Sequence, residues 1–184
     1  LRPVGQPRQR PKEGKRMTQR EKDFGPPAKE LKDRPSRARY EKVRSALELK
    51  SRRRTPQADL LMGEVVGALW RDFADLPYSG CGFHILNEDG TAVTPGNHRG
   101  KVPQPTLDPA GVVARAVKSG HPELCGDGGA SRVAVPVYDC EDRLWAVFEA
   151  VSDKPAAFDD MDMRWLERIV KVFQLVKRVG GGHC

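Results

Sequence analysis

The stretch Ser131–Asp160, SRVAVPVYDCEDRLWAVFEAVSDKPAAFDD, decides how the rest of the chain is interpreted. Valines stand at every second position from 133 to 137, which is the period of a β-strand. A polar turn at 139–143 separates this strand from a second β-rich run at 144–151. The stretch therefore predicts an antiparallel hairpin with a short connection.

An amphipathic helix is predicted directly after the hairpin. Asp159 is a favourable N-cap residue, while Lys177, Arg178 and Gly180 are typical of a helix C-terminus. Between these ends, large apolar residues recur at the three- and four-residue spacing of one helix face. They are Trp165, Leu166, Ile169, Val170, Phe173 and Val176.

Two cap-plus-proline pairs, Thr55-Pro56 and Asp108-Pro109, predict the starts of two further helices. Pro77 stops any continuation of the first helix, and Gly120 is placed to end the second. The remaining elements are a strand at Gly80–Leu86, a returning strand at Thr91–Thr94 and a Gly-rich loop at Cys125–Ser131. This order predicts an α+β fold, an antiparallel sheet with flanking helices.

Charge divides the chain more sharply than length does. Residues 1–55 carry 19 Lys+Arg against 7 Asp+Glu, whereas residues 56–184 carry 13 against 18. The basic pI near 9.4 therefore describes the N-terminal part. The mildly acidic remainder is not expected to be a nucleic-acid-binding domain.

We predict four regions from these patterns. Residues 1–35 are a disordered basic extension, 36–54 a charged helix or linker, 55–179 the folded domain and 180–184 a flexible tail. The basic residues 1–55 could contact a polyanion or nucleic acid, although the bland alternative is a solvated extension. No apolar run approaches the roughly 20 residues of a membrane span, so we expect no membrane partner and a cytoplasmic location. Met17 is an alternative first residue.

The segment 36–54 carries a thin apolar stripe, Tyr40, Val43 and Leu47, among charges. Such a stripe suits a helix that pairs with another helix, as in a homodimer, or that lies along a domain. A marginal solvent-exposed helix is the alternative.

Several short motifs resemble one family in order and spacing. They are Gly82-Phe83-His84-Ile85-Leu86, Gly100-Lys101-Val102, Gly111-Val112-Val113-Ala114, Cys125-Gly126, and the strands and F-D-x-x-D pattern that follow Arg132. From Thr55 to Val176 the chain resembles a GAF domain, and within that superfamily it is most similar to the free methionine-R-sulfoxide reductases. The resemblance implies a GAF-like sheet with flanking helices and a homodimer formed through terminal helices.

The catalytic positions of that reductase family are mostly substituted here. Arg115 stands where the family has a helix cysteine, and the loop 126–130, which in the family carries the attacking cysteine, contains no sulfur. Arg132 replaces a glutamate, Glu149 replaces one aspartate and Val151 another. Compared with the family, the change to Arg132 reverses the charge offered to a substrate ammonium group. A retained fold with lost reductase activity is therefore expected.

Candidate site residues follow from the resemblance: Phe83, Arg115, Cys125, Arg132 and Glu149 for a ligand, with Cys125 as the catalytic thiol if the chain is an enzyme. Cys125 could be redox-sensitive beside Arg115, or buried and inert. The four cysteines lack close C-x-x-C pairing and favour free thiols.

No metal and no cofactor are expected. Cys81 and His84 are three residues apart on a predicted strand, so their side chains project to opposite faces and cannot share a metal ion.

Three functions stay open from the sequence. The first is a non-catalytic sensory or interaction module that binds a small molecule or serves as a dimerisation scaffold. The second is a free methionine-R-sulfoxide reductase that uses Cys125 with an external thiol. The third is polyanion or nucleic-acid binding through the N-terminal extension.

Overall fold

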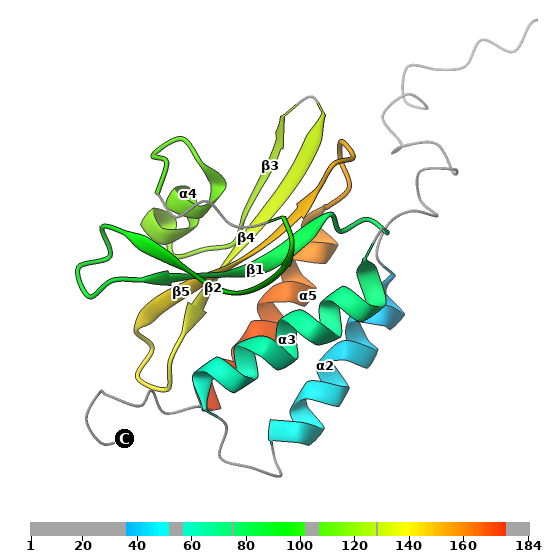
Figure 1. Cartoon of the computed structure of the whole chain (residues 1–184), viewed down its shortest axis with the longest axis horizontal. Coiled ribbons are helices and arrows are strands. Elements are labelled where there is room, and N and C mark those ends of the chain that lie inside the picture. Colours follow the sequence, from blue (N-terminus) through cyan, green and yellow to red (C-terminus); the bar gives the residue numbers. More distant parts are fainter. Residues whose placement is uncertain (1–35, 52–56, 75, 102–106, 128, 176–184) are drawn as a thin grey trace, which may run out of the picture. The chain divides into compact units, whose positions relative to one another are not determined.

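The structure is a computed structural model that describes residues 36–51, 57–74, 76–101, 107–127 and 129–175 (Figure 1). The predictions for the basic extension at 1–35, for Thr55-Pro56 and for the helix end at 177–180 lie outside these residues. The helices are α2 (Arg37–Ser51), α3 (Ala58–Phe73), α4 (Val112–Ser119), α5 (Asp160–Val170) and the 3₁₀ helix η2 (Lys171–Leu175). The strands are β1 (Gly80–Leu86), β2 (Val93–Gly100), β3 (Glu123–Asp127), β4 (Ala130–Tyr138) and β5 (Leu144–Ser152).

The strands form one five-stranded sheet in the order β2-β1-β5-β4-β3. Every pairing of neighbours is antiparallel, which confirms the predicted α+β fold. The β4–β5 hairpin predicted from alternating valines lies at the centre of the sheet. It brings together segments that are adjacent in the chain, whereas the pairing of β1 with β5 joins distant ones.

Asp139 holds the turn of this hairpin. Its Oδ1 accepts hydrogen bonds from the backbone N–H groups of Glu141 (2.9 Å) and Arg143 (3.0 Å), and its Oδ2 accepts one from Arg143 Nε (3.1 Å). Burial alone would raise the pKa of Asp139, but the hydrogen bonds and the Arg143 charge outweigh it and lower that pKa. The Asp139 side chain thus closes the turn and fixes where β4 ends and β5 begins.

The two faces of the sheet are covered differently (Figure 1). Helices α2, α3 and α5 lie on one side, and α4 lies on the other, against β3, β4 and β5. Because successive side chains of a strand alternate, Ala146, Phe148 and Ala150 of β5 enter the main core, whereas Val147 enters a smaller cluster with α4. We call the side that carries Val147 the α4 face.

Helix α5 begins as the sequence predicts. The Asp159 side chain accepts hydrogen bonds from the backbone N–H groups of Met161 (2.9 Å) and Asp162 (3.2 Å), and Asp162 Oδ2 accepts one from the Asp159 N–H (2.8 Å). This reciprocal arrangement is a capping box. The α-helix ends at Val170, earlier than predicted, because the backbone tightens into η2.

The apolar stripe of α2 is used within the chain. Tyr40, Val43 and Leu47 are buried, and α2 packs against α3 and α5. The Tyr40 hydroxyl lies 3.1 Å from that of Tyr78, which is also buried. Helix α2 therefore lies along the domain and is not a marginal solvent-exposed helix.

One helix start was predicted wrongly. Helix α4 begins at Val112, because Asp108 closes a turn in place of capping a helix: its Oδ1 and carbonyl oxygen accept from the N–H groups of Ala110 (3.0 Å) and Gly111 (2.8 Å). Helix α3 begins after Gln57, which caps it without a side-chain hydrogen bond.

Two strand predictions also need correction. The returning strand β2 runs from Val93 to Gly100, well beyond the predicted end at Thr94. Cys125 lies in β3 and not in a loop, since residues 123–127 form a ladder with β4. Gly126 within the strand and two glycines shortly after it in the sequence hide this strand, because glycine normally weakens strand propensity.

Within the described helices, none is long and apolar enough to cross a membrane.

Asp162 is an ionisable group in the seam between α2 and α5. Its side chain is fully buried and lies beside the hydroxyls of Tyr40 and Tyr78. Burial raises the pKa of Asp162 to about 7, against the opposing effect of the Asp159 N–H bond. The fold thus favours the neutral carboxyl.

We predict that Asp162→Asn gains stability relative to the wild type as the pH rises from about 4 to about 7. In that range the folded protein keeps a proton on Asp162 that the unfolded chain releases. Wild-type stability therefore falls with rising pH, by at most about 1.4 kcal/mol per pH unit from this group. Asparagine stays neutral and can still accept the Asp159 N–H bond.

Urea unfolding across and above this pH range measures the difference in unfolding free energy. Asp160→Asn, which changes an exposed carboxylate on the same helix, is the matched control. A difference between Asp162→Asn and wild type that stays constant over the range would contradict the prediction.

Candidate functional site

A diagonal row of polar side chains crosses the α4 face. Cys125 of β3 pairs with Arg132 of β4, and Arg132 pairs in turn with Val151 of β5. Glu149, two residues before Val151, lies on the same face and is the diagonal neighbour of Arg132. His84 of β1 stands in the same relation to Glu149, because Gly82 is the pairing partner of Glu149. Four strands thus contribute one side chain each.

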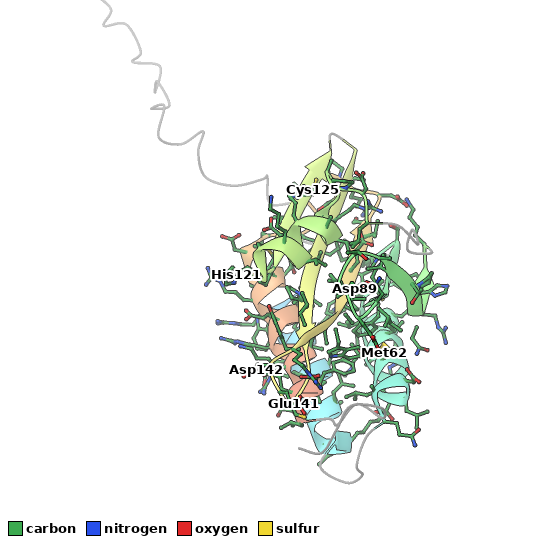
Figure 2. All side chains as sticks on the ribbon, turned by 90° about the vertical axis from the view of Figure 1, so that its left-hand side faces the viewer. Met62, Asp89, His121, Cys125, Glu141 and Asp142 are labelled. Carbon is green, nitrogen blue, oxygen red and sulfur yellow. The ribbon has the colours of Figure 1, made fainter. Side chains whose placement is uncertain are left out.

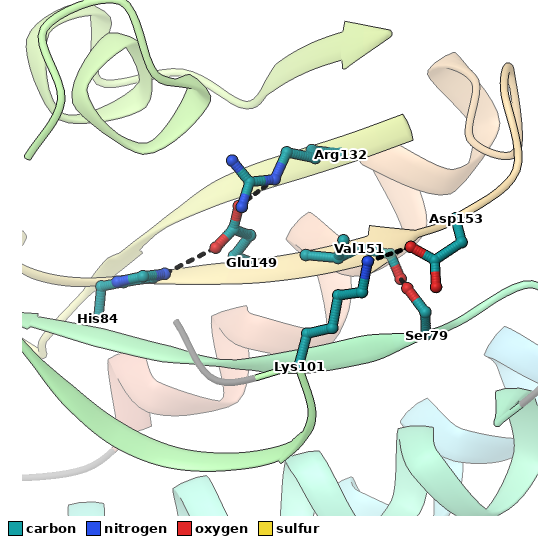
Figure 3. A network of polar contacts seen from close by, with 7 residues as sticks. All are labelled: Ser79, His84, Lys101, Arg132, Glu149, Val151 and Asp153. Atoms are coloured by element: carbon teal, nitrogen blue, oxygen red, sulfur yellow. Dashed lines mark hydrogen bonds and ion pairs between the residues drawn. The ribbon is translucent and has the colours of Figure 1, made fainter. Parts of the chain in front are cut away.

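The carboxylate of Glu149 is buried between two nitrogen donors (Figure 3). Its Oε2 accepts a hydrogen bond from His84 Nε2 at 2.8 Å, and its Oε1 lies 3.3 Å from Arg132 Nε. The Glu149 side chain is 4% exposed. A buried carboxylate is tolerated only when it is paired, so His84 and Arg132 are what allow Glu149 to occupy this position.

Three polar groups of the row keep unused capacity, and one of them is Glu149 Oε1, which makes no hydrogen bond within the described residues. His84 is buried, and its Nδ1 has no hydrogen-bond partner among the described residues. The Arg132 side chain is 41% exposed, and apart from the Nε contact with Glu149 it has no ion pair or hydrogen bond within the described part of the chain. Buried polar atoms are normally satisfied, so the Nδ1 of His84 points to a partner beyond the described residues.

Arg115 of α4 lies beside Cys125, as the sequence suggested. A hydrogen bond between its guanidinium and the Cys125 side chain raises the pKa of Arg115, and the charges of Cys125 and Glu123 add to this. The guanidinium is fixed by the carbonyl oxygens of Ala110 (3.0 Å) and Leu124 (3.3 Å), to which Nη1 and Nη2 donate. Arg115 Nε is 3.6 Å from Glu123 Oε2.

A second ion pair lies near the end of β5. Lys101 Nζ contacts Asp153 Oδ1, and both side chains are exposed. Next to it, the Ser79 hydroxyl donates to the carbonyl oxygen of Val151 at 3.1 Å (Figure 3). These contacts join the strand ends at an exposed position, whereas His84 and Glu149 of the polar row are buried.

Phe83 does not join this row. Its side chain is fully buried on the opposite face, with ring centroids 5.1 Å from Phe148 and 5.4 Å from Phe173. Of the predicted ligand residues, the structure therefore brings together Arg115, Cys125, Arg132 and Glu149 on one face.

His84 was missed as a site residue. From the sequence, His84 was a candidate only as a metal ligand with Cys81, and the structure confirms that these two lie on opposite faces. Because side chains alternate along β1, His84 could have been placed on the face opposite Phe83. Its contact with Glu149 depends on the pairing of β1 with β5, which the spacing of residues in the sequence does not predict. Among the described residues, no three His, Cys, Asp or Glu side chains gather as a metal site.

The described cysteines differ in environment. Cys81 is buried in the main core, and burial raises its pKa to about 12. Cys140 is disulfide-bonded, which corrects the expectation of a free thiol there. Figure 2 shows that its turn, marked by Glu141 and Asp142, lies at the opposite end of the sheet from Cys125.

A cavity of about 590 Å³ lies away from the row, between α2, β3 and the start of α5. Its lining includes three exposed arginines, Arg37, Arg164 and Arg168, together with Asp159, Asp160 and Trp165. None of its lining side chains is a buried polar group without a partner. The polar row is therefore the better candidate site.

Residues 59–173 match the family model for the GAF domain. The chain belongs to the GAF domain family. No curated protein matches the sequence significantly. Among solved structures, this GAF domain is similar to the free methionine-R-sulfoxide reductase of Neisseria meningitidis in complex with its substrate, with a TM-score of 0.65 and 19% identity over 76% of this chain and 90% of that chain.

Two further structures show the range of GAF proteins with this fold. The free methionine-R-sulfoxide reductase of Staphylococcus aureus, also with its substrate, has a TM-score of 0.65 and 18% identity over 76% of this chain and 95% of that chain. The GAF domain of the Acinetobacter phosphoenolpyruvate-protein phosphotransferase has a TM-score of 0.57 and 11% identity over 76% and 92%. At these identities the likeness is one of fold.

We predict that iodoacetamide modifies Cys125 of the folded protein at least about tenfold faster than Cys81. Cys125 is partly exposed and beside Arg115, whereas Cys81 is 2% exposed with a pKa of about 12. Mass spectrometry of peptides after timed alkylation measures both rates. Urea-unfolded protein, in which the two should react alike, is the control, and equal rates in the folded protein would show the prediction to be wrong.

Proposed function

We propose that this GAF protein is a non-catalytic sensory or interaction module that binds a small molecule on the α4 face. The observation that carries the proposal is the row built around Glu149. Its buried carboxylate is held by His84 and Arg132, and both partners retain polar atoms without protein partners among the described residues. A buried arrangement of this kind is suited to recognising a polar group of a ligand.

The arrangement of sulfur atoms supports a role without catalysis. A thiol reductase that recycles internally needs a second thiol that can reach the first. Cys81 lies on the other face of the sheet from Cys125, and Cys140 lies in a disulfide at the other end. Among the described residues, no second thiol is therefore placed beside Cys125.

A homodimer would suit the interaction role. The stripe of Tyr40, Val43 and Leu47 is already buried against α3 and α5. We therefore expect a dimer contact to use another surface of the chain.

We predict that the purified protein does not consume free methionine-R-sulfoxide in the presence of dithiothreitol. Cys125→Ser should behave identically, because the loop 126–130 has no attacking cysteine and because Arg132 and Val151 stand where the reductases have acids. Chromatographic measurement of remaining sulfoxide, with a known reductase as the positive control, checks this. Turnover by the wild type that disappears in Cys125→Ser would overturn the non-catalytic proposal.

The second candidate function is a sulfoxide reductase that uses Cys125 with an external thiol. The contact between Arg115 and Cys125 favours it, since a guanidinium can stabilise a thiolate. In that reaction the thiolate would take the sulfoxide oxygen, giving methionine and a sulfenic acid at Cys125. One external thiol would then form a mixed disulfide and release water, and a second would restore the thiol and leave as the oxidised disulfide. The same assay distinguishes the two functions.

A further inference from the structure

Arg132 is the residue of the row with the most unused binding capacity. Its single polar contact within the described residues joins Nε to Glu149 Oε1 at 3.3 Å. The two terminal nitrogens, Nη1 and Nη2, are therefore not engaged by described protein atoms. At 41% exposure, the side chain is held at its base and open at its tip.

The second arginine of the face is engaged differently. Both terminal nitrogens of Arg115 donate to backbone carbonyl oxygens, those of Ala110 and Leu124. Its remaining charge faces Glu123 and Cys125. Arg115 thus contributes positive charge next to Cys125 but offers no comparable pair of donors.

Both carboxylates of the face lie beside a cationic side chain. Glu149 is 4% exposed and lies between His84 and Arg132, and its Oε1 has the Arg132 charge beside it but no hydrogen bond among the described residues. Glu123 is 29% exposed and lies 3.6 Å from Arg115 Nε. A cationic ligand that approached Glu149 would meet the 41%-exposed guanidinium of Arg132 before the buried carboxylate. The planar pair of Nη donors matches instead two oxygens of one anionic group.

We propose that the ligand of the α4 face carries an oxyanion, either a carboxylate or a phosphate group, which Arg132 binds through Nη1 and Nη2. Glu149 is a positioning residue in this scheme, because it fixes the guanidinium through Nε and is itself fixed by His84. With Nε2–H donated to Glu149, the buried Nδ1 of a neutral His84 is an acceptor, and it would contact a donor group of the same molecule. This inference rests on the proposed function, in that it names the class of ligand for that site.

The test uses the full chain, labelled with ¹⁵N, and three probes: acetate, inorganic phosphate and methylammonium, added at constant ionic strength. We expect acetate or phosphate to shift the backbone amide signals of the row saturably, from His84 to Cys125, and methylammonium to leave them unchanged. Arg132→Gln should raise the anion dissociation constant at least about tenfold. Arg132→Lys, which keeps the charge next to Glu149 but loses the planar donor pair, should raise it by a smaller factor.

Arg164→Gln is the matched control, because Arg164 is an exposed arginine of α5 that lines the separate 590 Å³ cavity. It should leave anion binding at the row unchanged. Thermal unfolding of each variant verifies that the fold is intact. A higher affinity for phosphate than for acetate would identify a phosphate-bearing ligand, and the reverse order would identify a carboxylate.

Three results would overturn the oxyanion inference: methylammonium binding at the row without anion binding, no binding by any probe, or anion shifts that persist in Arg132→Gln. The first leaves the proposed function standing with a cationic ligand class. The proposed lack of catalysis is decided separately by the sulfoxide assay, so failure of one proposal can be distinguished from failure of the other.

Discussion

The register of β5 determines which side chains meet on each face of the sheet. This strand lies in the middle of the sheet, between β1 and β4, and nearly all of it is buried. Phe148 points into the core beneath α3 and α5, while its neighbour Glu149 points to the α4 face. A slip of one residue would place the carboxylate among aromatic rings and move the phenyl ring to the polar row. The Asp139 turn, which fixes the start of β5, therefore bears directly on the site.

The buried carboxylate also ties strands that are distant in the chain. Breaking a buried ion pair by removing one partner commonly costs several kcal/mol, because an uncompensated charge remains. Glu149 draws its partners from β1 and β4, so the position of each depends on the pairing of all three strands. The contacts of Glu149 with His84 and Arg132 consequently contribute both to the stability of the central sheet and to the geometry of the site.

Local patterns in the sequence predicted the parts of the fold that depend on local physics. The alternating valines before Tyr138 gave the hairpin, and Asp159 gave the start of α5, since both signals involve residues close in the chain. The helix start predicted at Asp108 was wrong because an aspartate side chain can close a turn as well as cap a helix. The strand containing Cys125 was missed because Gly126 and the glycines after it are typical of a loop, and only the pairing with β4 shows a strand.

The site was only partly predictable for the same reason. Arg115, Cys125, Arg132 and Glu149 could be selected by resemblance to a family. His84 could not, because its role depends on the lateral pairing of β1 with β5, which no spacing rule reveals. Phe83 was assigned to the ligand from its motif, yet strand alternation places it in the aromatic core. A sequence motif can identify a strand, but the face of the sheet to which each side chain points depends on the pairing register of that strand.

Helix α2 has a consequence for where this domain begins. The family match starts at residue 59, but Tyr40, Val43 and Leu47 lie upstream of it and are part of the main core. A fragment cut at the family boundary would expose the surfaces of α3 and α5 that these side chains cover. Such apolar surface promotes self-association. In this chain the hydrophobic core therefore extends upstream of the residues that the family model matches, so the edge of a family match need not coincide with the edge of a hydrophobic core.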